Sequence, residues 1–229
     1  MPKRYDGVFF DVGGTLWRWP SGHTPAGVWA RTLVGHGHAI AHSSIESALR
    51  DADARTRGIF PPTMEAQRAF FREYDRLVLS RLGLPADPAL MEDVDRAFLP
   101  MSEPPRCFDD ALSTLDRLRS EGYRLGIISN ASHELPDSLR EHNVAERMDA
   151  VTYSWEVGAE KPDPRIFQVA LDRLGVRAER AVHVGNEYGK DVRGARAAGL
   201  TPILLDVQRE AKETDCLIIK CLADIFRHL

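Results

Sequence analysis

The sequence has few cysteines, no long apolar run and no excess of basic residues, and each shortage excludes a class of protein. The three cysteines stand in no spacing typical of a metal site, and we interpret them as reduced and structural: Cys107, Cys216 and Cys221. We expect no signal peptide and no membrane helix, which requires roughly 18 apolar residues. The net charge of −4 argues against a nucleic-acid partner, because phosphate backbones attract basic surfaces. The expectation is a cytoplasmic protein that binds neither membrane nor nucleic acid.

Short apolar runs alternate with helical patterns through most of the chain. The runs cover residues 5–10, 123–128, 181–184, 202–205 and 216–219. The helical patterns cover residues 109–121, 134–142, 164–174 and 190–198. Strands that alternate with helices of this length form a parallel sheet with right-handed crossovers. We therefore predict the α/β class, with a Rossmann-like parallel sheet and helices on both of its faces.

Residues 21–105 have a different pattern. Their apolar positions have helical spacing, as in Phe70, Phe71 and Tyr74, and they contain no clear strand. Prolines punctuate the stretch and end it near residue 105. We expect an inserted α-helical cap domain of four or five helices over residues 21–105. The Rossmann-like core then consists of residues 1–20 and 106–229.

Three of the predicted strands are followed by small or polar residues. Asp11, Ser129 and Asn186 each stand at or just after the end of an apolar run. In an open α/β sheet, ligands bind in the crevice outside the carboxyl ends of the strands. We therefore expect these three residues to converge on one site, although they are far apart in the sequence.

Four segments in order carry a family resemblance. They are Asp11-Val-Gly-Gly-Thr-Leu16, Ile128-Ser-Asn130, Lys161-Pro-Asp-Pro-Arg-Ile-Phe167 and His183-Val-Gly-Asn-Glu-Tyr-Gly-Lys-Asp191. One segment alone is a weak signal, and an unrelated α/β domain is the alternative. Together, at strand ends and helix starts, they resemble the haloacid dehalogenase-like hydrolase superfamily with a helical cap of the first type. The resemblance covers essentially the whole chain.

The resemblance implies a role for each motif. A carboxylate can attack phosphorus and form a covalent ester that water then cleaves, and Asp11 is the implied nucleophile. Lys161 and Ser129 are the implied groups that offset charge and hold anionic oxygens. The implied phosphate and substrate contacts are Gly13, Gly14, Thr15 and Asn130. Arg18 is a further candidate contact for an anionic substrate, with packing between core and cap as its alternative role.

The implied cofactor is Mg²⁺, and two departures from the family pattern affect it. The expected ligands are Asp11, the Gly13 carbonyl, Asn186 and Asp191. Gly13 stands where most phosphatases of the family have a second aspartate, and losing a general acid/base removes about 10²- to 10⁴-fold in rate. Asn186 stands where the family usually has a metal-binding aspartate, and Mg²⁺ is held mainly by carboxylates. We expect weak Mg²⁺ binding, with Glu187 as a candidate compensating acid.

The leading hypothesis is a hydrolase that acts on a small phosphorylated metabolite through an aspartyl-phosphate on Asp11, with slow turnover because of Gly13. The partner is then a small anionic substrate or inorganic phosphate. One alternative is a metal-independent 2-haloacid dehalogenase, although that branch usually has a tyrosine at the Gly13 position. The other is a catalytically weak or inactive protein that binds a phosphate ligand. The phosphonate-cleaving branch needs a cap lysine, and residues 21–105 contain none. We interpret His183 as a buried strand residue rather than a base.

Overall fold

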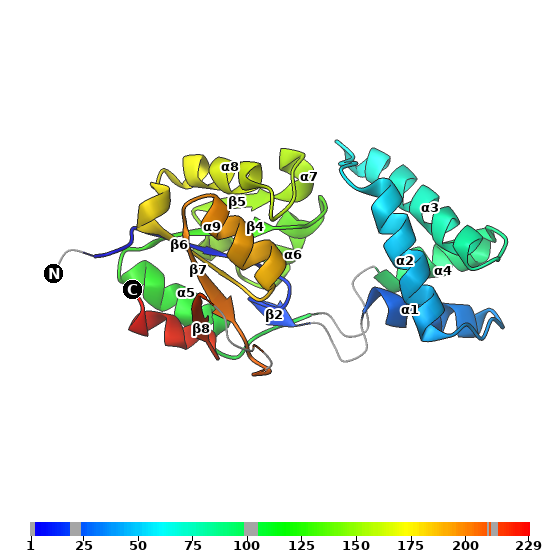
Figure 1. Cartoon of the computed structure of the whole chain (residues 1–229), viewed down its shortest axis with the longest axis horizontal. Helices are drawn as coiled ribbons and strands as arrows, with labels where there is room; N and C mark the ends of the chain where they lie inside the picture. Colours follow the sequence, from blue (N-terminus) through cyan, green and yellow to red (C-terminus); the bar gives the residue numbers. More distant parts are fainter. Residues whose placement is uncertain (1–2, 19–23, 99–104, 210, 212–214) are drawn as a thin grey trace. The chain divides into compact units, whose positions relative to one another are not determined.

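Two structural units, between which the chain crosses twice, make up the protein (Figure 1). The computed structural model describes residues 3–18, 24–98, 105–209, 211 and 215–229. The core unit consists of Met1–Arg18 and Arg106–Leu229, and the helical unit of Trp19–Pro105. Residues 20 and 21, where the sequence places the boundary, lie outside the described residues. Within the described part of the chain, no helix has the length and apolarity needed to cross a bilayer.

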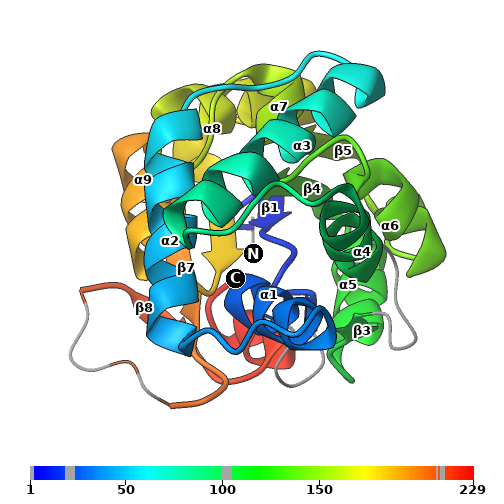
Figure 2. The same ribbon diagram turned by 90° about the vertical axis from the view of Figure 1, so that its right-hand side faces the viewer.

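The helical unit contains four helices among its described residues. They are α1 (Pro25–Gly35), α2 (His42–Thr56), α3 (Met64–Arg81) and α4 (Pro88–Phe98). Threonine side chains cap two of them: Thr24 accepts from the Gly27 N–H at 3.0 Å, and Thr63 from the Ala66 N–H at 3.2 Å. α2 contacts α3, and α1 contacts both α2 and α4 (Figure 2). The unit therefore has an apolar interior of its own, which includes the buried Trp29.

A parallel sheet, six-stranded in the described residues, forms the centre of the core unit. Its order is β5-β4-β1-β6-β7-β8. The strands are β1 (Gly7–Phe10), β4 (Arg124–Ser129), β5 (Ala150–Tyr153), β6 (Ala181–Gly185), β7 (Thr201–Leu205) and β8 (Leu217–Ile219). β1 lies between β4 and β6 and is buried throughout. All the carboxyl ends of the strands thus point to one edge of the sheet, as the sequence predicts.

Helices cover both faces of this sheet (Figure 1). α5 and the 3₁₀ helix η4 contact one face, and α8 and α9 contact the other. The helices are α5 (Ala111–Ser120), α6 (Leu135–Glu141), α7 (Ser154–Val157), α8 (Pro164–Leu174) and α9 (Arg193–Ala197). Shorter turns are η1 (Ala145–Arg147), η2 (Ala178–Arg180), the π-helical turn η3 (Tyr188–Val192) and η4 (Leu222–Arg227). The predicted α/β class and its parallel sheet are confirmed.

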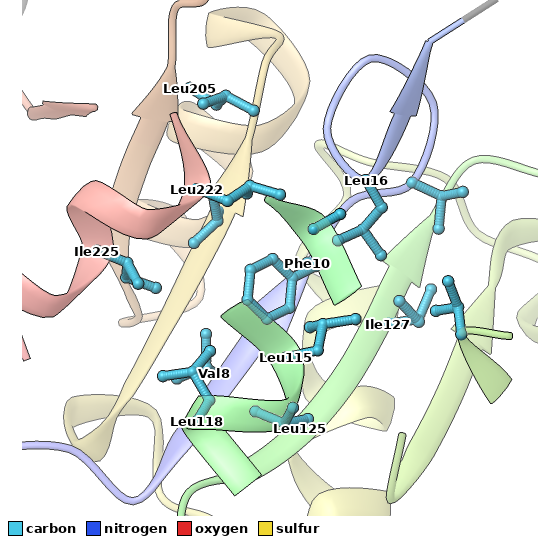
Figure 3. Close-up of a cluster of buried hydrophobic side chains, with 14 of the residues drawn as sticks. Val8, Phe10, Leu16, Leu115, Leu118, Leu125, Ile127, Leu205, Leu222 and Ile225 are labelled. Carbon is cyan, nitrogen blue, oxygen red and sulfur yellow. The ribbon is translucent and has the colours of Figure 1, made fainter. Parts of the chain in front are cut away.

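Alternate residues of β1 supply the two sides of the core. Val8 and Phe10 point to the side of α5, where they meet Leu115 and Leu118 (Figure 3). Phe9 points to the opposite side and packs with Phe167 of α8. Full burial of an apolar side chain of this size contributes roughly 1.5–3 kcal/mol relative to exposure. This two-sided packing fixes the end of β1, and with it the residue that follows.

Three local features differ from the sequence-based expectation. β5 was not expected, because Ala150–Tyr153 contains a threonine and does not form the continuous apolar run that marked the other strands. The helix expected from residue 190 begins two residues earlier with the π-helical turn η3. A small antiparallel ladder pairs β2 (Trp17–Arg18) with β3 (Arg106–Cys107), at the two points where the chain leaves and re-enters the core unit.

Candidate active site

Asp11 stands directly after β1, in a tight loop at the carboxyl edge of the sheet. Its backbone N–H still donates to the Val184 carbonyl of β6 at 2.9 Å. The chain then turns, and the Val12 carbonyl accepts from the Leu16 N–H at 2.8 Å. Gly14 has φ +82°, and a Cβ there would lie 2.5 Å from the Asn186 amide nitrogen. A glycine is therefore required at this position on grounds of both conformation and space.

Lys161 links two carboxylates that the sequence places far apart. Its Nζ lies 2.6 Å from Asp11 Oδ1 and 2.6 Å from Asp191 Oδ1. Lys161 is 3% exposed and Asp191 is 2% exposed. We call Asp11, Lys161 and Asp191 the charge triad. Buried ions of this kind persist only where each has a partner, so the triad fixes the position of all three side chains.

Burial and pairing act in opposite directions on the triad. Burial raises the pKa of Asp11 above its ordinary value, although the Lys161 ammonium opposes the shift. Burial alone would also raise the pKa of Asp191, but donors from His183 and Lys161 outweigh it and hold that pKa below its usual range. Burial disfavours a charged Lys161, yet the two carboxylates raise its pKa. Asp191 and Lys161 are thus charged at neutral pH, whereas Asp11 ionises at a higher pH than a free aspartate because its pKa is raised.

Two hydroxyl groups complete the surroundings of Asp11. Ser129, the last residue of β4, places Oγ 3.4 Å from Asp11 Oδ1. Thr15 Oγ1 lies 3.3 Å from Asp11 Oδ2 and 3.2 Å from Asn186 Oδ1. A hydroxyl has one proton, so Thr15 donates to one of these oxygens at a time. The structure therefore brings together the three residues that sequence reasoning expected to converge.

The side chain of Asn130 holds the main chain of Lys161. Its Nδ2 donates to the Lys161 carbonyl at 3.1 Å, and its Oδ1 accepts from the Lys161 N–H at 2.7 Å. Both ends of the amide are therefore used in positioning Lys161. The expected contact between Asn130 and substrate would therefore have to come from the backbone of Asn130 rather than from its side chain.

Arg18 and Glu187 have other neighbours. The Arg18 guanidinium lies 5.8 Å from the Phe108 ring centroid, a packing contact within the core unit. The Glu187 carboxylate pairs with exposed Lys190 at 3.0 Å. The Glu187 backbone N–H, however, donates to Asp191 Oδ2 at 2.9 Å. Glu187 therefore supports the triad through its main chain.

Two residues of β6 reach the triad without having been expected to. His183 is fully buried, and its Nε2 lies 3.0 Å from Asp191 Oδ1. A Cβ on Gly185 would lie 2.1 Å from the Asp191 carboxyl carbon, so only glycine leaves room for that carboxylate. Their spacing of two along the strand places both on one face, which is the signal that the sequence offered.

The oxygen donors expected for Mg²⁺ are of a suitable kind, but few of them are charged. Within the described residues, no cluster of three or more His, Cys, Asp and Glu side chains is arranged to hold a metal ion. The expected oxygen donors are the carboxylates of Asp11 and Asp191, the Asn186 amide and the Gly13 carbonyl. Hard oxygens fit Mg²⁺, but only two of these four carry charge. In the structure Lys161 already bonds to both of those carboxylates.

Comparison with known proteins identifies the family of the chain. The family model described as "haloacid dehalogenase-like hydrolase" matches residues 5–199. The chain therefore belongs to the haloacid dehalogenase-like hydrolase family. It is 34% identical over 207 residues to a glyceraldehyde 3-phosphate phosphatase of Methanopyrus kandleri, covering 86% of this chain and 82% of that one.

Two further similarities have narrower meaning. A glyceraldehyde 3-phosphate phosphatase of Methanothermobacter thermautotrophicus is 42% identical over 111 residues, or 48% of this chain. The match spans about half of that relative's length, 49%. The crystal structure of a 2-haloacid dehalogenase from Pseudomonas syringae pv. Tomato DC3000 superposes with a TM-score of 0.71, at 23% identity over 97% of both chains. This likeness shows the shared fold.

Proposed function

We propose that the chain hydrolyses a small phosphorylated metabolite through a covalent aspartyl-phosphate on Asp11. The observation that carries this proposal is the 2.6 Å contact between Asp11 Oδ1 and the buried Lys161 ammonium. The contact brings a carboxylate and a positive charge together at the carboxyl edge of the sheet, which supports a nucleophilic role for Asp11. Similarity to proteins named as phosphatases of a three-carbon sugar phosphate supports a substrate of this size. The described cysteines form no disulfide, which supports a cytoplasmic location.

The proposed reaction has two displacements at phosphorus. Asp11 Oδ2 lies 3.3 Å from the Thr15 hydroxyl, whereas the Lys161 and Ser129 contacts are to Oδ1, so Oδ2 has a lone pair for attack. It forms a bond to phosphorus while the ester P–O bond breaks, and the leaving alkoxide takes a proton from water or from the substrate. Water then attacks the aspartyl-phosphate, which releases inorganic phosphate and restores the carboxylate.

The remaining groups bind and orient the phosphoryl oxygens. The Lys161 ammonium, the Ser129 hydroxyl and the Gly13 N–H are donors suited to an anion. The Gly14 and Thr15 N–H groups instead donate to the Trp17 and Val12 carbonyls within the loop. Bound Mg²⁺, held by Asp11, Asp191, Asn186 and the Gly13 carbonyl, would neutralise further negative charge. Gly13 has no side chain to protonate the leaving group. Slow turnover follows from the proposal, with leaving groups of low pKa reacting fastest.

The test compares wild type with Asp11→Asn on a panel of phosphate esters, with Mg²⁺ and with a chelator. We expect phosphate release by wild type and a loss of about 10³-fold or more in the variant, since an amide cannot act as the nucleophile. Equal residual activity of the two proteins would rule out the Asp11 mechanism. Release of halide from a 2-haloacid, unaffected by the chelator, would instead identify a dehalogenase. Phosphate binding without hydrolysis across the panel would identify a binding protein.

A second variant examines the missing acids. Gly13→Asp combined with Asn186→Asp restores both carboxylates of the family pattern. We expect faster phosphate release and tighter Mg²⁺ binding, because a proton donor and a charged ligand are added. If the double variant folds and shows no gain in rate, the two departures do not limit the reaction.

A further inference from the structure

His183 occupies a position in β6 from which it reaches the charge triad. Its ring Nε2 lies 3.0 Å from Asp191 Oδ1, the same oxygen that accepts from Lys161 at 2.6 Å. The other oxygen of Asp191 accepts from the Glu187 N–H at 2.9 Å. His183, Asp191, Lys161 and Asp11 therefore form one line of hydrogen bonds that begins inside the sheet and ends at the nucleophile.

The direction of the His183 bond follows from the other contacts of its partner. Asp191 Oδ1 accepts from the Lys161 ammonium and Oδ2 accepts from the Glu187 N–H, so both carboxylate oxygens act as acceptors. His183 Nε2 must then carry the hydrogen. The other ring nitrogen, Nδ1, is buried with no hydrogen-bonding partner in the described part of the chain. A proton there would add a buried, unpaired N–H, so the ring is the neutral Nε2–H tautomer.

Packing on all sides fixes this ring in place. Within the sheet, His183 is paired with Phe9 of β1 and with Pro202 of β7. The Phe167 ring of α8 packs edge-on against the imidazole, at 5.3 Å between centroids and 86° between planes. Asp191 has equally little freedom, since its carboxyl carbon fills the space left by the absent side chain of Gly185. Donor and acceptor are therefore both held by rigid surroundings.

An apolar side chain would satisfy the core at this position at lower cost. Among the described residues, a histidine here buries an Nδ1 without a partner, which disfavours folding, and makes its one polar contact with Asp191. We propose that His183 is a positioning residue: its neutral Nε2–H aims Asp191 Oδ1 at Lys161, and so holds the Lys161 ammonium against Asp11. The kinetic part of this inference rests on the proposed phosphatase function, whereas the tautomer and the bond to Asp191 do not.

The first measurement needs no variant. Long-range ¹H–¹⁵N spectra of the histidine rings in the full chain identify the tautomer of His183, with the His183→Gln spectrum used for assignment. We expect a protonated Nε2 and an unprotonated Nδ1. A protonated Nδ1 would overturn the inference and leave the proposed function intact. This readout also remains valid if the chain hydrolyses no phosphate ester.

The second measurement compares three variants on p-nitrophenyl phosphate. His183→Leu fills the space without a donor, and we expect kcat to fall about 10- to 100-fold with KM nearly unchanged. His183→Gln places an amide N–H near the Nε2 position and should recover most of that loss. His142→Leu is the matched control, because His142 lies against the Trp17 ring and its Nδ1–H donates to the Ser138 carbonyl at 2.8 Å instead of to the triad.

The pattern across these variants decides the question. If His183→Gln is as slow as His183→Leu while both keep the folded structure, the hydrogen bond has no positioning role. If His142→Leu lowers kcat equally, the loss reflects general destabilisation, and the inference is again wrong. Where His183→Leu does not fold, the tautomer and the Gln variant still provide the two decisive readouts.

Discussion

Asp191 and Asp75 are both buried carboxylic acids, one in each unit, and their surroundings give them opposite charge states. Asp191 receives hydrogen bonds from Lys161, His183 and a backbone N–H, and its pKa lies below the usual range. Asp75, on α3 of the helical unit, is 4% exposed. Burial, together with its hydrogen bond to the Asp95 carboxyl, raises the pKa of Asp75 to about 8.

The difference shows that the partners of a buried acid decide whether the effect of burial on its pKa is overcome. One oxygen of Asp75, Oδ2, has no partner among the described residues. Neutralisation is then the cheaper state, since an unpaired buried charge costs far more than a bound proton. In the core unit three donors meet Asp191, and the ion persists. A buried acid is thus available for electrostatic work only where the fold also supplies its counter-charge.

Removal of Lys161 is the strongest way to break this comparison, because it leaves two acids of the core without their shared cation. We expect Lys161→Met to lower kcat on a phosphate ester by about 10²- to 10³-fold or more. We also expect a loss of about 3–5 kcal/mol in the free energy of unfolding, measured with urea. Lys190→Met, which removes an exposed lysine paired with Glu187, is the control and should change both quantities little. A stable, active Lys161→Met protein would contradict the role given to the triad.

Replacement of Asp75 tests the other side of the comparison. The folded state keeps the Asp75 proton up to about pH 8, whereas the unfolded chain loses it near 3.8. Wild type therefore loses stability as pH rises across this window, by at most about 1.4 kcal/mol per pH unit. Asp75→Asn keeps the shape and removes the titration. Thermal unfolding between these pH values should show the variant gaining stability over wild type as pH rises.

Two charged groups act near Asp75. The Asp95 carboxyl raises the pKa of Asp75, and Arg72 partly offsets the rise that burial causes in the pKa of Asp95. Parallel pH profiles for Asp75→Asn and wild type would show that Asp75 is ionised in the folded state. Activity at fixed pH is the second readout, and we expect it to change little because Asp75 belongs to the helical unit.

The smallest expected effect concerns helix capping, which is found in both units. Thr63 caps α3 of the helical unit, and Asp163 caps α8 of the core unit by accepting from the Arg165 N–H at 2.9 Å. Thr63→Ala should cost about 1 kcal/mol of stability by chemical denaturation, and Thr63→Ser should restore it. Because Asp163 follows Lys161 by two residues, only Asp163→Ala should also weaken phosphate binding. Equal effects of both caps on phosphate binding would contradict this separation.

Sequence reasoning reached the parts of the fold that depend on period and order. Apolar runs gave the strands, and the residues at their ends gave the convergence of Asp11, Ser129 and Asn186. The contacts of Lys161 with Asp191 and Asn130 could not be predicted, because the periodicity of a sequence gives no distances between residues far apart in the chain. His183 was correctly assigned to a buried strand, but its bond to Asp191 depends on a carboxylate eight positions away being folded back against Gly185. The edge strand β8 was recognised from its apolar run, whereas β5, Ala-Val-Thr-Tyr, has no such run and was missed.

The small ladder of β2 and β3 joins the two ends of the helical unit, so this unit is an insertion that other segments could replace. Trp17 pairs with Cys107, and Arg18 pairs with Arg106, so the chain leaves and re-enters the core unit at neighbouring points. The entropy of closing this circuit varies only slowly with the length of what is spliced in. Insertions of quite different size can therefore follow the same two strands. The charge triad is built wholly from core residues, so its hydrogen bonds do not depend on the insertion.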